Sequence, residues 1–517
     1  MSEATRASTE GAPADAGPGK AGFPVVLSAD RTLMAAQRTL FDGMLCGSQT
    51  TRTPSLLVRW LLAPRVTQRG CRASAAPLGL RRLEAAVATA GWDVAVVPPE
   101  RLPAAIGPAT RIIGLSCGDP LGLGMSSTTM TAIVGGRTHA SRALQRLTRR
   151  VARLRKAAPD SRLVVGGPGA WQLAADDDAR RRLVIDHVVT GYCEGNVGQL
   201  FDAVCNGRDT PTVLPGEGVG AETIPPILGP ALMGSSEISR GCGLGCEFCA
   251  LARTPMVHLP HRTILADVET NLAGGAGTIT LVTEDIFRYG AGGSRVRPRA
   301  VLDLLQAIRT RAGDRLIQAD HANVLSASAF SDGQLADVAR LLAGREGRDD
   351  YVWLNLGVET AAGKLLAANG GRGKMGSIDP GEWGAFCREQ TLRLCRAGFF
   401  PLVSLVLGLP GESADDLAAT LAWVENLRDE RLAVFPVLRA PMDGGAPFGR
   451  HEMSKLHWRI MRESYRLSFR WLTRLIWNNQ SRGGVALWRR LTLQMLGRMQ
   501  MVWWRTLFAW RLWRAQP

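Results

Sequence analysis

The sequence predicts an α/β protein, and two observations carry that prediction. Over residues 26–225, short apolar runs alternate with amphipathic helical patterns, which is typical of a doubly wound parallel sheet. Over residues 226–445, further apolar runs end in polar or glycine-containing turns. The flanking parts differ: residues 1–25 are rich in small and polar side chains and are expected to be disordered, whereas residues 446–517 show a basic helical repeat.

The bulk composition fits a multidomain protein of a reducing compartment. A chain of 517 residues exceeds one ordinary domain, so two or three are expected. Ten cysteines in this length do not make a disulfide scaffold, which fits the cytoplasm. The N-terminus shows no apolar segment of a secretory signal, and no apolar run reaches the length of about 18 residues that a membrane span needs.

The N-terminal α/β part is read from its apolar runs and the turns that follow them. We expect strands at residues 56–62, 94–97, 112–116, 163–165 and 187–189. We expect helices at residues 78–90, 141–157 and from about 196 to 206. The carboxyl ends of parallel strands share one edge, where such sheets bind ligands. Three turns collect at that edge and contain the candidate residues Ser116, Gly166, Gly167 and Gly191.

The strongest chemical signal is a cysteine loop. Cys242, Cys246 and Cys249 have the spacing C-x3-C-x2-C, glycines separate the first two, and Phe248 precedes the third. Three thiolates on one short loop can hold three irons of a [4Fe–4S] cluster and leave the fourth iron open. The alternatives are a zinc site with His258 as fourth ligand, or unrelated buried thiols.

This loop resembles the signature of the radical S-adenosylmethionine (SAM) enzymes, in which the open iron binds the amino and carboxyl groups of SAM. The resemblance implies a partial (β/α)6 barrel over residues 226–445. It assigns Phe248 to the adenine side, Glu284 or Asp285 to the SAM amino group, Glu359 to SAM, and the Gly408 turn to adenine. The alternative for each is structural, since a Glu at a strand end often caps a helix and a Gly-Leu-Pro-Gly segment is a common turn.

The N-terminal part is similar to the cobalamin-binding domain that precedes the radical SAM core in one large subfamily. The similarity lies in LRRLEAAVATAGWDVAVV, IIGLS, VVGGPGA and VVTGYCEG. It implies that Ser116, Gly166, Gly167 and Gly191 face cobalamin. The D-x-H-x-x-G motif, whose His ligates cobalt in many such domains, is absent, so the lower axial ligand is open. The alternative is a related domain that has lost its cofactor and only packs on the core.

The C-terminal part is basic and rich in Trp. Residues 450–517 carry fourteen Lys and Arg against two Glu. Arginines recur at helical spacing on one stripe of a first helix, and a break is expected at residues 478–484. In a second helix, one Arg-free face carries Trp488, Leu491, Met495, Met499, Trp503, Trp510 and Trp513. This pattern suits an anionic membrane surface or a helical cap on the barrel, and nucleic acid less well.

Together these features predict a cobalamin-dependent radical SAM C-methyltransferase that acts on an unactivated carbon of a hydrophobic or natural-product substrate. The resemblance implies a [4Fe–4S] cluster, SAM, cobalamin and an electron donor of the flavodoxin or ferredoxin type. A ring-forming or rearranging enzyme like the tetrapyrrole cyclases is the second hypothesis. A zinc-stabilised membrane- or RNA-binding protein is the third. We expect a cytoplasmic location, with peripheral contact at the inner face of the membrane as the alternative.

Overall fold

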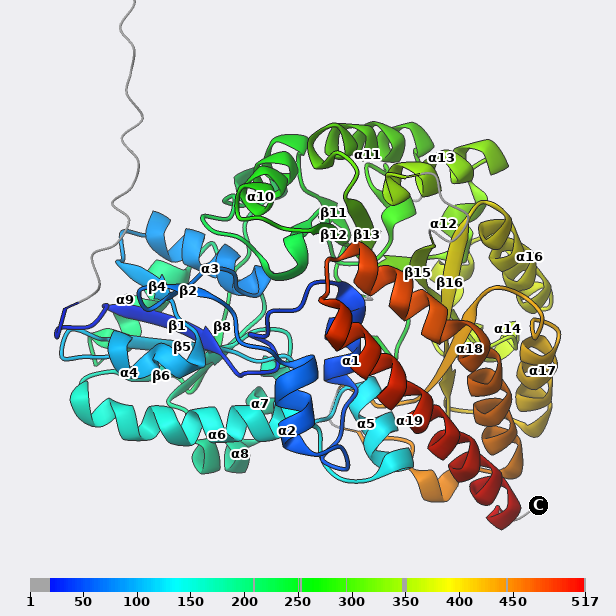
Figure 1. Ribbon diagram of the computed structural model, residues 1–517, viewed down its shortest axis with the longest axis horizontal. Coiled ribbons are helices and arrows are strands. Elements are labelled where there is room, and N and C mark those ends of the chain that lie inside the picture. Colours follow the sequence, from blue (N-terminus) through cyan, green and yellow to red (C-terminus); the bar gives the residue numbers. More distant parts are fainter. Residues whose placement is uncertain are drawn as a thin grey trace, which may run out of the picture.

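Two α/β parts lie side by side, and two long C-terminal helices cross the second (Figure 1). The computed structural model describes residues 19–207, 210–249, 251, 253–293, 295–345, 351–442 and 445–515. The expected disordered tail at residues 1–25 falls mostly outside this description, and Val25 already belongs to the first strand.

The N-terminal part is a six-stranded parallel sheet of order β4-β1-β5-β6-β7-β8. The strand order reverses between β1 and β5, which places a topological switch point at their carboxyl ends. The strands are β1 Val25–Ala29, β4 Val94–Val96, β5 Ile112–Ser116, β6 Arg162–Gly166, β7 His187–Thr190 and β8 Val213–Pro215. The doubly wound prediction is confirmed for this sheet.

Helices cover both faces of this sheet. One face packs against α3 Leu78–Thr89 and α9 Val197–Cys205, through a core that includes Leu80, Val87 and Phe201. The other face packs against α4 Leu102–Ala105, α6 His139–Leu154, α7 Ala170–Ala174 and α8 Asp177–Leu183. A small hairpin, β2 Gln68–Arg69 with β3 Arg72–Ala73, precedes α3.

One strand prediction is wrong. Residues 56–62 are helical: α2 Ser55–Leu57 runs into a π-helical turn at Val58–Leu62. Val58, Leu61 and Leu62 are buried while Arg59 is exposed, so the burial follows a helical period and not strand alternation. The missed first strand is β1, whose five residues are all buried. A run buried on both faces carries no alternating pattern that would announce it.

The second part contains parallel strands in two sheets, ordered β13-β12-β9 and β14-β15-β16-β17. Asp320 connects the two sheets, because its N–H donates to Leu281 and its carbonyl accepts from Asn355. The strands are β9 Ser235–Glu237, β12 Thr278–Val282, β13 Leu316–Ala319, β14 His321–Ala322, β15 Val352–Glu359, β16 Phe399–Leu407 and β17 Ala433–Leu438. The helices are α10 His261–Ala273, α11 Pro298–Ala312, α12 Val324–Ser328, α13 Asp332–Ala343, α14 Gly363–Ala368, α15 Arg372–Met375, α16 Trp383–Arg396 and α17 Ala414–Glu425.

The amino ends of these strands are closed by segments from both ends of the chain. The helix α1 Leu40–Gly47 packs Phe41 against Trp353 at the start of β15, with ring centroids 5.1 Å apart. The helix α18 Lys455–Arg482 packs beside α1, where Gln480 Nε2 donates to Asp42 Oδ1 at 2.9 Å. The carboxyl ends are therefore the side on which a ligand site can form.

The predicted break at residues 478–484 is shorter and later in the structure, where it spans residues 483–486. The helix α18 continues through Asn479 and Gln480 to Arg482, and α19 Leu487–Arg514 follows Gly483 and Gly484. Asn479 and Gln480 are buried, and they donate to Gln318 and Asp42 at 3.1 and 2.9 Å. Tertiary partners thus keep polar residues inside a helix that their local preference would end.

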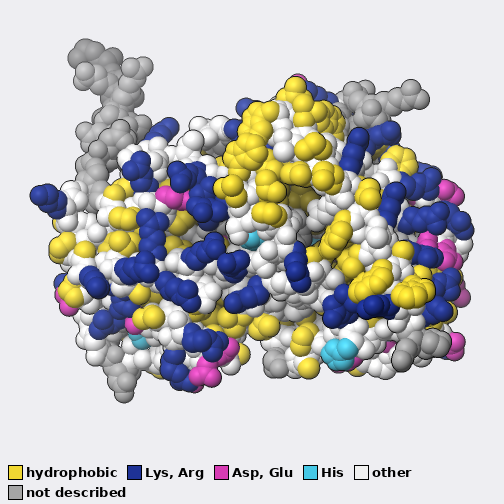
Figure 2. Space-filling view, turned by 60° about the horizontal axis from the view of Figure 1, so that its bottom comes forward, with side chains coloured by type: hydrophobic (Ala, Val, Ile, Leu, Met, Phe, Trp, Pro, Cys, Tyr) yellow, Lys and Arg dark blue, Asp and Glu magenta, His cyan; other side chains and the backbone are white. Residues whose placement is uncertain are grey.

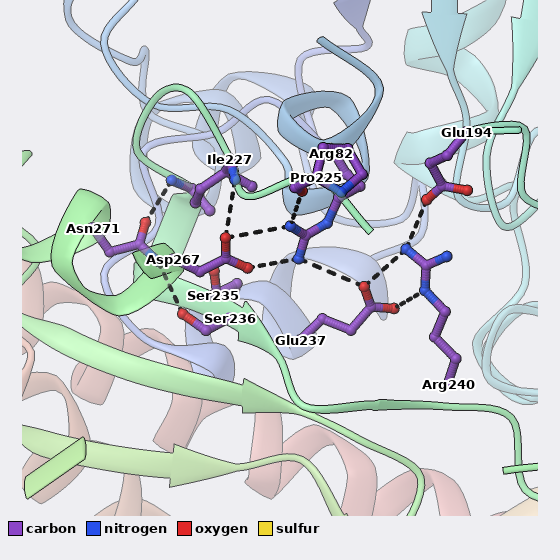
Figure 3. A network of polar contacts seen from close by, with 11 residues as sticks. Arg82, Glu194, Pro225, Ile227, Ser235, Ser236, Glu237, Arg240, Asp267 and Asn271 are labelled. Atoms are coloured by element: carbon purple, nitrogen blue, oxygen red, sulfur yellow. Dashed lines mark hydrogen bonds and ion pairs between the residues drawn. The ribbon is translucent and has the colours of Figure 1, made fainter. Parts of the chain in front are cut away.

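A buried ion network joins the two α/β parts (Figure 3). Arg82 of α3 binds both carboxylate oxygens of Asp267 of α10, at 2.6 and 3.3 Å, and it lies 3.7 Å from Glu237 of β9. Arg240 binds Glu237 and reaches Glu194, which follows β7, at 2.7 Å. All five side chains are nearly inaccessible to solvent, so each charge depends on its partners for compensation.

Replacing Arg82 by methionine leaves Asp267 buried without a cation. We expect Arg82→Met to lower the free energy of unfolding by about 3–5 kcal/mol, measured by denaturant titration. The matched control is Arg111→Met, which breaks the exposed pair with Asp160 and should cost about 1 kcal/mol or less. Equal losses in the two variants would contradict a structural role for the network.

Candidate active site

The cysteine loop leaves the second part at a two-stranded ribbon, in which β10 Ser239–Arg240 pairs with β11 Val257–His258. Cys246 is buried, Cys242 is half-buried and Cys249 is exposed. The loop needs its glycines: Gly241 has φ +77°, and a Cβ there would lie 2.3 Å from the carbonyl oxygen of Pro255. The predicted tight wrapping of this loop is thus a steric requirement.

The donor set of this loop fits a cluster better than a single ion. In the residues that the structure describes, no three His, Cys, Asp or Glu side chains converge as they would around one metal ion. His258 lies in the ribbon opposite Ser239, and its ring packs against Tyr289. A [4Fe–4S] cluster binds each thiolate through a different iron, so it accepts thiolates that lie farther apart than the ligands of one zinc ion.

Two cations lie near the thiols. Burial raises the pKa of Cys246 to about 11, and the ammonium of Lys374 opposes that shift. Burial also raises the pKa of Cys242, against which Arg288 acts, and Arg288 Nη1 donates to the carbonyl of Cys242 at 2.8 Å. Burial favours the protonated thiols, and a bound metal would displace these thiol protons because it binds the thiolates.

Glu359 ends β15 in a left-handed conformation with φ +67°, one of three such non-glycine residues in the described part of the chain. A register shift between Gly357 and Glu359 turns the strand end at this point. The carboxylate forms a buried ion pair with Lys374 of α15. Burial lowers the pKa of Lys374, but Glu359 raises it by more, so the lysine stays charged. Lys374 lies in no recognisable motif, so the sequence analysis did not identify it as a site residue.

The structure distinguishes Glu284 from Asp285. Asp285 is fully buried and accepts hydrogen bonds from Ser326 Oγ at 2.5 Å and from the N–H groups of Phe287 and Asn323. Burial raises its pKa to about 6. Glu284 is half-buried, its pKa is raised by burial, and the imidazole of His321 opposes that shift. Only Glu284 of the two has a carboxylate that a ligand could reach.

A second polar pair follows β13. His321 Nδ1 lies 3.2 Å from Asp320 Oδ1, which also accepts from Asn355 Nδ2 at 3.2 Å. Desolvation lowers the pKa of His321, and the Asp320 carboxylate raises it by more, to about 9. His321 is therefore a cation at neutral pH. Glu284 contributes to the same shift, so the carboxyl ends of β12 and β13 bring these three residues together.

The backbone groups of Gly408 form hydrogen bonds within the protein. Its N–H donates to Glu412 Oε2 at 3.0 Å, and its carbonyl accepts from Arg439 Nε at 2.9 Å. A Cβ at Gly408 would lie 2.1 Å from the ring of Phe448, so glycine is required there. Arg439 thus supports the turn. Phe248 is buried in the core of this part.

The carboxyl edge of the N-terminal sheet meets this site. Glu194 binds Arg240, two residues before Cys242, and the Arg240 guanidinium lies 4.0 Å from the ring centre of Tyr192. On the other side, Thr129 of α5 Met125–Val134 accepts a hydrogen bond from the N–H of Leu438. The two parts therefore contact one another at the carboxyl edges of their sheets, through the turn after β7 and through α5.

The four candidate residues of this edge have different surroundings. Ser116 ends β5 and Gly166 ends β6, while Gly191 follows β7 and is exposed. A Cβ at Gly167 would lie 2.7 Å from Ser116 Oγ, so these two residues pack on one another. The histidines of this part, His139 and His187, bond to the backbone oxygens of Thr53 and Pro211. Neither follows a strand at this edge.

Comparisons with known proteins fit this geometry. No family model matches the sequence. Curated relatives include the ribosomal protein uS12 methylthiotransferase RimO of Syntrophobacter fumaroxidans, 25% identical over 207 residues, which are 38% of this chain and 41% of that protein. RimO of Pelobacter propionicus is 26% identical over 261 residues, 48% of this chain and 53% of that protein. The chain spans about half the length of these curated relatives.

Solved structures show the same fold. The radical S-adenosylmethionine methyltransferase TsrM of Kitasatospora setae, with cobalamin and a [4Fe–4S] cluster bound, matches with TM-score 0.51 and 16% identity over 80% of this chain and 75% of that chain. The form with tryptophan substrate and a SAM analogue matches with TM-score 0.53 over 81% of this chain. At this identity the likeness establishes the fold.

Removing the Asp320 charge tests the polar pair. We expect Asp320→Asn to lower the pKa of His321 from about 9 toward the ordinary 6.5, because the main source of its stabilisation is lost. The pKa is measured by NMR titration of isotope-labelled histidine, with His321→Gln to assign the resonance. Asp337→Asn, which changes an exposed carboxylate, is the control and should leave it unchanged. An unshifted pKa in Asp320→Asn would refute the pairing.

Proposed function

We propose that this chain, which belongs to the radical SAM superfamily, is a cobalamin-dependent C-methyltransferase of an unactivated carbon in a hydrophobic small molecule. One observation carries the proposal. The ligand-binding edge of the N-terminal sheet lies against the cysteine loop, where Glu194 binds Arg240 at 2.7 Å. A cofactor on that edge would face a cluster on Cys242, Cys246 and Cys249, with the substrate between them.

The residues present fit the three cofactors. The three cysteines would hold the [4Fe–4S] cluster, Glu284 and Glu359 are the proposed SAM contacts, and the turns at Ser116, Gly166, Gly167 and Gly191 would receive cobalamin. When bound, these groups supply a radical route for methyl transfer to a carbon that is no nucleophile. The parallel strands β9 and β12 to β17 support the partial (β/α)6 barrel that carries this site, with domain boundaries near residues 225 and 445.

The chain's own residues prepare the site. Lys374 places a buried positive charge near the thiolates and holds Glu359 in one orientation. Protonated His321 donates to Asp320 from Nδ1 and holds a further proton at Nε2, available to a substrate oxygen or nitrogen. The helices α1 and α18 close the amino ends of the strands, and the N-terminal part contacts the carboxyl side.

We propose a chemical class for the substrate. The K. setae TsrM was solved with tryptophan as substrate, and a small aromatic or hydrophobic molecule is the corresponding expectation here. An electron donor of the flavodoxin or ferredoxin type would reduce the cluster. In the described part of the chain, no helix combines the length and the apolar character needed to cross a bilayer.

Replacing the cluster cysteines tests the core of the proposal. After anaerobic reconstitution with iron, sulfide and reductant, we expect Cys242→Ala, Cys246→Ala and Cys249→Ala each to lose the cluster and all cleavage of SAM to 5′-deoxyadenosine. Cys205→Ala, which removes a half-buried thiol of α9, is the matched control and should keep both. Iron and acid-labile sulfide are assayed chemically, and 5′-deoxyadenosine by mass spectrometry. Zinc without iron in the wild type would return the protein to the non-enzymatic hypothesis.

The products of SAM distinguish the candidate reactions. Methyl transfer through cobalamin predicts S-adenosylhomocysteine together with 5′-deoxyadenosine, and it predicts that omitting cobalamin abolishes the former. The curated RimO relatives make methylthio transfer the second candidate, in which the product gains sulfur as well as carbon. A cyclase-like enzyme would form 5′-deoxyadenosine without S-adenosylhomocysteine. Formation of S-adenosylhomocysteine without cobalamin would exclude the leading proposal.

A further inference from the structure

The helix α19 has one side that packs against the protein and one side that is exposed to solvent. Its inner side packs Trp504 and Phe508 against Tyr465 of α18, with ring centroids 4.8 and 5.0 Å apart. Its outer side, here named the tryptophan face, exposes 39–80% of each of Trp488, Leu491, Met495, Met499, Val502, Trp503, Trp510 and Trp513. At 100° per residue these positions lie on a single stripe of the helix. The stripe is therefore a continuous apolar surface on a packed helix.

The tryptophan face continues onto a second segment. The ring of Trp60 stacks on Trp488 with centroids 5.2 Å apart, and Trp60 is 56% exposed. Leu56 of α2 is 78% exposed nearby in the same helical segment. Residues separated by more than 400 positions thus extend one apolar surface. A contiguous exposed apolar patch that is assembled from two segments marks an interaction site.

The surroundings of this face are positively charged. The helix α19 contains six arginines and no Asp or Glu. Arg498 and Arg505 border the tryptophan face on one side and Arg514 on the other, and all three are exposed. Figure 2 shows hydrophobic side chains gathered into raised patches among Lys and Arg side chains that far outnumber acidic ones. A partner that fits this face therefore has an apolar interior, which contacts the tryptophan face, and a negatively charged surface, which contacts the arginines.

We propose that the tryptophan face docks the protein onto an anionic lipid bilayer. Tryptophan prefers the membrane–water interface, where its ring is buried among acyl chains and its N–H stays in the polar layer. Arginines at the border of an amphipathic helix meet lipid phosphates at the same depth. A second copy of this chain would bring two acid-free, arginine-bearing helices together, and like charges would oppose that contact.

The test is flotation of the full chain with vesicles. We expect binding to phosphatidylcholine vesicles that contain about one quarter phosphatidylglycerol, little binding to pure phosphatidylcholine, and weaker binding at high salt. Met499→Glu places a negative charge in the middle of the tryptophan face and should weaken binding about tenfold or more. Arg498→Gln and Arg505→Gln should each weaken binding to the anionic vesicles about fivefold.

A matched control separates the face from general charge. Gln500→Glu introduces the same negative charge on an exposed neighbouring residue that points away from the tryptophan face, and it should bind within about twofold of the wild type. Both variants change exposed positions, so unchanged thermal unfolding verifies their folding. Equal loss in Met499→Glu and Gln500→Glu would overturn the assignment.

Two other outcomes would also overturn it. Sedimentation velocity could show a wild-type dimer that Met499→Glu dissociates, with no vesicle binding, and the occupant would then be a second copy. Binding of a single-stranded RNA oligonucleotide in the absence of vesicle binding would assign the face to nucleic acid. The vesicle assay needs neither cluster nor cobalamin, so its failure is independent of whether the proposed reaction holds.

Discussion

The architecture depends on a chain of buried charges that runs from Glu194 through Arg240, Glu237 and Arg82 to Asp267. Three carboxylates and two guanidinium groups compensate one another only while both α/β parts are in place (Figure 3). Arg240 leads into the cysteine loop, so the same contacts that join the parts also position that loop. These ion pairs therefore help to fix the distance between the two proposed cofactor sites.

This coupling explains why the polar groups of the site come from so many strands. Glu284, His321 and Glu359 each follow a different strand of the second part, and Tyr192 and Glu194 follow a strand of the first. Parallel strands deliver their ends to one edge, and the two sheets contact one another near such edges. The charge on Lys374 and on His321 is maintained in each case by an adjacent carboxylate.

The sequence predicted the parts whose signal is local. The cysteine spacing, the glycine turns and the strands at residues 94–97, 112–116, 163–165 and 187–189 could be read directly, because each depends on neighbouring residues. Lys374 could not be found, since its role arises from an ion pair with Glu359 on another element. The Gly408 turn was located correctly, but its backbone partners Glu412 and Arg439 depend on tertiary packing. The fully buried β1 was missed and the 56–62 segment misread, because short apolar runs do not reveal their period.

The contact between Gln480 and Asp42 joins residues that are 438 positions apart. During synthesis, α1 emerges from the ribosome long before α18, and its Phe41 then has neither Trp353 nor Leu475 to pack against. The first α/β part can form its sheet from residues up to 215. The helix α1, which follows β1, cannot complete its packing until α18 has been made. Folding around α1 is therefore tied to the synthesis of α18, and until α18 is made the apolar side of α1 is open to chaperones.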